Sequence, residues 1–166
     1  MSAELLLGLF VGAAISGVVP LVNAELLVVG AAAVAPAGAI PLVALVSAAG
    51  QMLTKTALYG VARWLPARLP AKAREALQRG GDRLAGRSRA AASVIFGSAT
   101  MGLPPFYGVS LAAGALRVRL GTFVVSGMAG RVLRFGALAW GGHQAGARIA
   151  GSAATTLLGL DVGGGR

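Results

Sequence analysis

Apolar positions along this chain form two short runs followed by a long one, and this order occurs twice. In the first half, residues 5–19 and 21–35 are short apolar runs separated by Pro20, and residues 42–63 form a longer run. As a helix, each short run is about 22 Å long, which is less than the ~30 Å hydrocarbon core of a bilayer. The pattern therefore predicts a re-entrant helical hairpin followed by one transmembrane helix.

The second half has the same plan. Residues 91–103 are apolar and end at Pro104 and Pro105, a further apolar run reaches residue 118, and residues 121–142 form another long run. Identical residues also recur at an offset of 84 in the hairpins and of 80 in the spans (Pro20 and Pro104, Leu27 and Leu111, Gly30 and Gly114; Gly50 and Gly130, Leu53 and Leu133, Leu58 and Leu138). We therefore expect an internal repeat in which each half is a hairpin followed by a span.

The segment between the two halves is strongly basic. Eight of the fifteen basic residues lie between Arg63 and Arg89, where Glu75 and Asp82 are the acids, so this segment carries a charge of +6. By the positive-inside rule, such a loop stays cytoplasmic. The first hairpin then opens to the outside and the second to the cytoplasm, which is the inverted arrangement of many secondary transporters. A surface helix and a solvated loop are both compatible with the basic segment.

These steps predict an all-α integral membrane protein, an inverted repeat of two re-entrant helical hairpins, each followed by a transmembrane helix. By its length the chain is a single membrane domain. We expect four parts in order: a first repeat (1–63), a basic cytoplasmic loop (64–90), a second repeat (91–142) and a flexible tail (143–166).

Composition agrees with a membrane protein and excludes several kinds of chemistry. The chain is 56% hydrophobic and only 12% charged, too little polar surface for a soluble domain of 166 residues. Cysteine is absent, so disulfides and thiol catalysis are excluded, and one histidine (His143) with five acidic residues is too few for a multi-ligand metal centre. The net charge of +10 is concentrated in one loop, so nucleic acid is not an expected partner. No hydrolase, kinase or dinucleotide motif occurs, and we expect neither an enzyme nor a cofactor.

The polar residues at the two proline breaks are the candidate site. Non-helical backbone at membrane depth is tolerated only where protein or a water-filled cavity surrounds it. The break at Pro20 and the break at Pro104 and Pro105 should therefore face each other. Amide groups at the start of the following helices would suit an anion. Asn23 is expected to cap the helix after the first break, which places Glu25 in its first turn.

Two interpretations of Glu25 are open. It is either a helix-terminus acid satisfied by backbone groups, or a buried carboxylate that pairs with a cation and takes up and releases a proton. Its candidate partners are Lys55, Arg131 and Arg134, which lie within the predicted spans and should point inward. Arg131 and Arg134 are three residues apart and so share a helix face. Arg134 is alternatively an anchor closer to the membrane interface.

Three segments resemble a known family: "VVPLVNAELLVVGAA", "GQMLTKTALYG" and, most specifically, "LPPFYGVSLAAGALRVRLGTFVVSGMAGRVLRF". Over roughly residues 8–142 the chain resembles the DedA membrane proteins (VTT-domain, SNARE-associated Golgi protein type), especially their short bacterial members. The resemblance implies two oppositely facing re-entrant hairpins with adjoining spans. It also implies flipping or scrambling of phospholipids or polyprenyl-phosphate carriers, linked to the proton gradient. Glu25 matches the acidic residue of the family's first hairpin.

The chain departs from the family at the second break. The family usually carries one arginine three residues before the proline of the second hairpin and another three residues after it. If Pro104 is that proline, the positions hold Met101 and Tyr107. A phosphate-clamping pair of arginines is therefore missing there. Either cations from the spans replace the pair, or this chain moves a different substrate.

Three functions remain in view. The leading hypothesis is a lipid or lipid-phosphate translocator of the bacterial inner membrane, a multi-pass protein with Glu25 as its proton-linked acid. The second is a proton-coupled transporter of small solutes or ions. The third is a non-transporting structural membrane protein in which Glu25 forms a structural ion pair. The expected partners are the bilayer and its phospholipid or polyprenyl phosphate, and a chain with so few spans is a candidate for homo-oligomerisation.

Overall fold

The protein is helical throughout the part that the structure describes. The structure, a computed structural model, describes residues 2–17, 19, 23–64, 75 and 88–157. Six α-helices and one short 3-10 helix (η1) account for most of these residues, and none of them forms a strand: α1 (Ala3–Ser16), α2 (Ala24–Val34), η1 (Ala37–Ala39), α3 (Ile40–Trp64), α5 (Ser88–Met101), α6 (Phe106–Ala115) and α7 (Leu120–Leu157). The all-α prediction is confirmed. Pro20 and nearly all of the basic loop lie outside the described residues.

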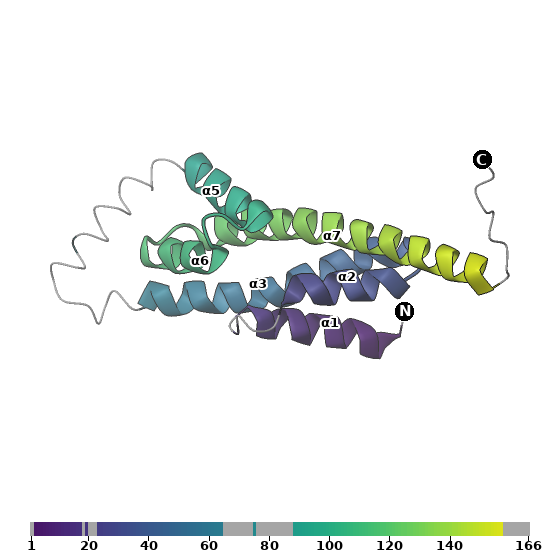
Figure 1. Cartoon of the computed structure of the whole chain (residues 1–166). Helices are drawn as coiled ribbons and strands as arrows, with labels where there is room; N and C mark the ends of the chain where they lie inside the picture. Colours follow the sequence, from purple (N-terminus) through teal and green to yellow (C-terminus); the bar gives the residue numbers. More distant parts are fainter. Residues whose placement is uncertain (1, 18, 20–22, 65–74, 76–87, 158–166) are drawn as a thin grey trace.

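Two long helices carry the fold, and the short helices are placed on them in pairs. Figure 1 shows α3 and α7 side by side, with α1 and α2 at one end of the molecule and α5 and α6 at the other. In the first half, α1 packs on α3 and α2 packs mainly on α7. In the second half, α5 packs on α7 and α6 packs on α3. The two helix pairs thus open toward opposite ends of the molecule, and their turns lie near its middle (Figure 1).

The helix that follows each turn buries equivalent positions in the two halves. Ala24, Val28 and Ala32 are buried on α2, and the residues 82 positions later are buried on α6, namely Phe106, Ser110 and Gly114. The first residues of these helices, Ala24 and Phe106, have the same separation. The buried positions of the two helices are thus 82 residues apart, whereas the identical residues of the two sequences are 84 apart. The buried positions match when the helices are aligned on their first residues and not on their prolines.

Only part of the predicted membrane crossing is present as an apolar helix. Among the described residues, the stretch Ala37–Trp64 is the one helix long and apolar enough to cross a membrane by length and composition, and it includes the predicted span 42–63. The helix α7 is 38 residues long. It does not reach the same hydropathy, because Arg131 and Arg134 lie in its apolar part.

The second long helix extends well beyond its predicted end at residue 142. Residues 143–157 of the expected tail continue α7 as helix, and residues 158–166 lie outside the described part. Gly142 and Gly146 explain the extension. A Cβ on these residues would lie 2.6 Å and 2.2 Å from the carbonyl oxygens of Val29 and Ala33, so both glycines let α7 lie directly against the backbone of α2.

Two apolar cores lie on either side of a polar layer. The first core joins α2 to the early part of α3 and to the middle of α7, with Val28, Val43 and Phe135 at its centre. The second core joins α6 to the later part of α3 and to the start of α7, with Phe106 and Phe123 stacked in it at 6.0 Å between ring centroids. Gln51 and Arg131 are buried where the long helices pass from one core to the other, and Lys55 is buried one turn further along α3.

The end of α6 has an unusual residue at its cap. Arg117 donates its backbone N–H to the carbonyl of Gly114 (3.0 Å), and Val118 donates to that of Ala113 (2.9 Å), which is the bonding pattern of a Schellman cap. In this motif the position of Arg117 is left-handed and usually glycine. Arg117 has φ +55°, and an L-residue with a side chain pays about 1–2 kcal/mol for that conformation.

The contact between α1 and α3 provides a test of the packing. A Cβ on Gly50 would lie 2.2 Å from the carbonyl oxygen of Phe10, whereas a Cβ on Gly60 of the same helix would meet nothing within 4 Å. We expect Gly50→Ala to destabilise the fold by about 2 kcal/mol through overpacking. Gly60→Ala should be neutral or stabilise by about 0.5–1 kcal/mol, since alanine is the better helix former. Thermal unfolding in detergent micelles measures both, and equal melting temperatures for the two variants would contradict the close approach.

Candidate functional site

The start of α2 is fixed by a side-chain cap. The Asn23 side-chain oxygen Oδ1 accepts hydrogen bonds from the backbone N–H groups of Glu25 (2.9 Å) and Leu26 (3.4 Å). Asn23 itself is extended, with φ −92° and ψ 103°, as an N-cap residue should be. The predicted cap is confirmed, and Glu25 lies in the first turn of the helix, as predicted.

Arg134 is the partner of Glu25. Its Nε donates to Glu25 Oε1 at 3.0 Å, and its Nη2 donates to the same oxygen. Its Nη1 donates to the backbone carbonyl of Thr100 at 2.8 Å, near the end of α5. One guanidinium on α7 therefore holds the start of α2 and the end of α5 together. The alternative of Arg134 as an interfacial anchor does not agree with these bonds.

Lys55 has a different set of contacts. It is buried in α3, and its Nζ donates to the carbonyl of Gly17 at 2.7 Å, just after α1 ends. The same Nζ lies 5.3 Å from the ring centroid of Tyr107, in the first turn of α6, a distance at which an ammonium is attracted to the ring face. Lys55 thus also contacts both turns, and it does not pair with Glu25.

Arg131 is buried, like Lys55. It is 8% exposed, and its Cζ lies 4.8 Å from the ring centroid of Phe106. Its Nε is buried and has no hydrogen-bond partner among the described residues, and the same holds for Oε1 of Gln51. The amide nitrogen of Gln51 donates to the Ser16 hydroxyl at 3.2 Å. Arg131 therefore has one buried donor, and Gln51 one buried acceptor, without a partner among the described residues.

These residues surround one cavity of about 330 Å³. It is lined by residues next to the first turn, by residues of the second turn and by polar side chains of the two long helices: Ser16, Asn23, Ala24 and Glu25; Gly102, Pro105, Phe106 and Tyr107; Gln51, Lys55, Arg131 and Arg134. Three cationic groups and one carboxylate line it, so its side chains carry a formal excess of two positive charges. The sequence predicts that the two breaks face each other. Among the described residues, those beside the first break and those of the second break do line the same cavity.

The second break is held by its own contacts. The Ser98 hydroxyl donates to the carbonyl of Pro104 at 2.6 Å, and Pro105 occupies the N-cap position of α6. Met101, where the resembled family has an arginine, is 75% exposed and does not line the cavity. Arg134 donates to the carbonyl of Thr100, directly before Met101. Arg131 lies on the ring of Phe106, directly before Tyr107. Cations from α7 thus stand beside the break that lacks its own arginines.

Sequence reasoning missed five cavity residues: Ser16, Ala24, Gln51, Gly102 and Phe106. Gln51 lies four residues before Lys55 and therefore on the same helix face, a spacing that would have indicated it. Ser16 and Phe106 lie directly beside the two breaks, but an apolar or hydroxyl side chain at such a place carries no signal of its own. Their role is visible only after the two turns are brought together.

The Glu25–Arg134 pair predicts strong coupling between two distant parts of the chain. We expect Glu25→Ala and Arg134→Ala each to destabilise the fold, because each leaves one charge without its partner. The double variant should lose about 1–2 kcal/mol less than the sum of the single changes, the range for residues in direct contact. Thermal unfolding of all four proteins measures this. Glu4→Ala with Arg148→Ala is the matched control, since these exposed residues form no ion pair with each other. Additive effects at Glu25 and Arg134 would contradict the pair.

Comparison of the chain with family models, with curated proteins and with solved structures gives no match. The resemblance to the DedA proteins therefore rests on the three quoted segments and on their order. What this site does is inferred below from the geometry of its own residues.

Proposed function

We propose that this chain is a membrane lipid translocator, which moves the phosphate head group of a phospholipid or of a polyprenyl phosphate through the cavity between the two helix turns. The proposal extends to a multi-pass location in a bacterial inner membrane and to an inverted repeat of re-entrant hairpins. The observation that carries it is a polar cavity of about 330 Å³, lined by three cations from two long helices and in contact with both apolar cores through Ala24 and Phe106.

The charges of the cavity favour an anionic head group. Lys55 offers an ammonium and Arg131 a buried Nε that lacks a partner among the described residues. Guanidinium groups bind phosphate through short, charge-assisted hydrogen bonds, and lysine binds it as a point charge. The hydroxyl of Ser16 and the amide of Gln51 add neutral polar groups. A cationic solute would meet a net positive lining, which disfavours the alternative of a cation transporter.

The depth of the cavity favours transport over surface binding. Lys55 is nine residues from the end of α3 at Trp64 and fifteen from its start at Ile40, which corresponds to about 14 Å and 22 Å along the helix axis. A charged group placed near the middle of a bilayer is costly and marks a substrate or proton pathway by default. The opposite orientation of the two helix pairs agrees with the design of transporters that bind substrate near the midplane.

Glu25 provides the proposed link to protons. As a carboxylate it accepts two hydrogen bonds from Arg134 through one oxygen. When a proton binds to that carboxylate, the acid becomes neutral and the ionic part of the pair is lost. Arg134 is then free to bind the phosphate of the lipid. When the phosphate leaves Arg134 and the proton leaves Glu25, the ion pair forms again. Uptake of one proton at Glu25 together with binding of one head group at Arg134 would couple lipid movement to pH.

A non-transporting structural role is the second candidate. Arg134 joins α2 to α5, and Lys55 joins the end of α1 to the start of α6. These contacts would hold the two helix pairs together whether or not anything passes between them. The two functions differ in whether loss of the cations changes lipid movement or only stability.

Transport in reconstituted liposomes separates the two functions. We expect the wild-type protein to move fluorescent phosphatidylglycerol between leaflets and Arg131→Gln to reduce the initial rate at least tenfold, because a cavity cation is removed. Arg148→Gln, the same change at an exposed position outside the cavity, should retain the rate. Circular dichroism and melting temperature confirm that both variants are folded. A wild-type protein that moves no lipid would refute the proposal.

The proton link has its own test. We expect the rate of the wild-type protein to depend on pH and that of Glu25→Gln to be independent of pH, since glutamine keeps the shape of the side chain and cannot titrate. The measurement is the leaflet-to-leaflet rate at several values of pH, equal on both sides of the vesicle. Equal pH profiles for both proteins would contradict the proposed role of Glu25 while leaving translocation itself in place.

The proposed orientation is tested by labelling in this cysteine-free chain. Cysteines introduced at Ser2, next to α1, and at Ser88, at the start of α5, should be accessible from opposite faces of the membrane. A membrane-impermeant maleimide applied to intact cells and to inverted vesicles reports which face each residue occupies. Labelling of both positions from the same face would overturn the inverted arrangement.

A further inference from the structure

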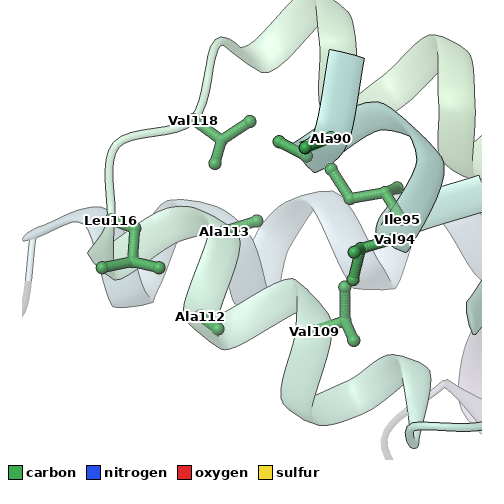
Figure 2. A pocket seen from close by; sticks show the side chains of 9 residues that line it. Ala90, Val94, Ile95, Val109, Ala112, Ala113, Leu116 and Val118 are labelled. Carbon is green, nitrogen blue, oxygen red and sulfur yellow. The ribbon is translucent and has the colours of Figure 1, made fainter. Parts of the chain in front are cut away.

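A second cavity lies between the two helices of the second pair. It has a volume of about 160 Å³ and is lined only by apolar side chains, among them Val94 and Ile95 on α5, Ala113 on α6, and Leu116, which follows α6. Figure 2 shows these side chains around the space, with Val118 closing it at the end where α6 gives way to α7. The cavity opens to the surface, where Val94 is 55% exposed. Apolar surface is buried favourably against apolar groups, so the occupant that this cavity suits is hydrocarbon.

Exposed arginines flank this cavity along the chain. Arg89 precedes Ala90, and Arg117 and Arg119 stand on either side of Val118; both Ala90 and Val118 line the cavity. All three arginines are exposed, and among the described residues none of them forms an ion pair. An apolar space beside unpaired cations complements an amphiphile with a hydrocarbon tail and an anionic head.

The backbone at Arg117 gives an independent reason to assign a role to this side chain. Its φ of +55° is in the left-handed region that glycine adopts without strain. The hydrogen bonds of the cap would be made equally well by glycine, which is the usual residue there. Arg117 occupies this strained position directly before Val118, which lines the cavity. Strain of this kind indicates that the arginine side chain has a role besides forming the turn.

We infer that the α5–α6 cavity, with Arg89, Arg117 and Arg119 beside it, binds one anionic phospholipid of the cytoplasmic leaflet, with a segment of acyl chain in the cavity and the phosphate among the arginines. The cytoplasmic side follows from the basic segment between α3 and α5, and anionic lipids are abundant in that leaflet. The inference rests on the proposed function for its membrane location. It assigns a second lipid site, separate from the polar cavity, from which a lipid can approach the transport path along α6.

Lipid retention measured by native mass spectrometry tests this site. The purified full-length chain is titrated in detergent with phosphatidylglycerol and with phosphatidylcholine that carry the same two acyl chains, so that only the head group differs. We expect tighter binding of phosphatidylglycerol, and a loss of about fivefold in its affinity for Arg117→Gly, the effect of one arginine at a membrane surface. Phosphatidylcholine binding should not change. Because glycine relieves the left-handed strain, this variant should melt at the same temperature as the wild type or higher, so weaker binding is not a folding defect.

A second variant tests the cavity itself. Ala112→Leu places a larger side chain into the cavity from α6 and should weaken retention of both lipids severalfold, whereas Ala57→Leu on the exposed face of α3 should not. Equal binding of the two lipids by the wild-type protein would overturn the anionic site. If Ala112→Leu instead converted a dimer to a monomer with lipid retention unchanged, the cavity would belong to a second copy of the chain, which also overturns it.

The result is distinguishable from a failure of the proposed function. A protein that prefers phosphatidylglycerol and yet moves no lipid in liposomes refutes translocation and supports this site. A protein that moves lipid and binds both head groups equally refutes this site and supports translocation.

Discussion

The arrangement of this molecule depends on one constraint: cations inside an apolar protein must be held by groups from other parts of the chain. Lys55, Arg131 and Arg134 occupy the middle of the two long helices. Lys55 bonds a backbone carbonyl, Arg131 lies on an aromatic ring, and Arg134 bonds a carboxylate and a carbonyl. All of these groups are at or beside the two turns. These contacts join the two helix pairs at the middle of the long helices.

Local features of the site could be predicted from sequence, because they depend on neighbouring residues. Asn23 and Glu25 are two positions apart, so the cap and the first-turn acid follow from helix geometry alone. The choice of Arg134 over Lys55 and Arg131 as partner of Glu25 could not be predicted, since it depends on the rotation of α7 relative to α2. Gly142 and Gly146 set that contact by close packing.

The same two glycines account for the continuation of α7 beyond residue 142. In a chain with 26 glycines, a pair of them near the end of an apolar run indicates a loosening helix as readily as a packing face. The two cases differ only in whether another backbone lies alongside. Here the carbonyls of Val29 and Ala33 do so, and their contact supports α7 past residue 142. Whether another backbone lies beside a glycine cannot be predicted from the neighbouring sequence, because it depends on how the helices pack.

The two halves share a packing plan but differ in chemistry. Thr54 donates its hydroxyl to the carbonyl of Ala14 near the end of α1, while Arg134, eighty residues later, donates to that of Thr100 near the end of α5. The position of Glu25 on α2 corresponds, 82 residues on, to Tyr107 on α6. Arg134 and its acid Glu25 thus come from different halves, and the corresponding positions, Thr54 and Tyr107, are neutral. This asymmetry makes the two sides of the cavity inequivalent: a carboxylate and a guanidinium meet between α2 and α7, whereas an ammonium faces an aromatic ring between α3 and α6.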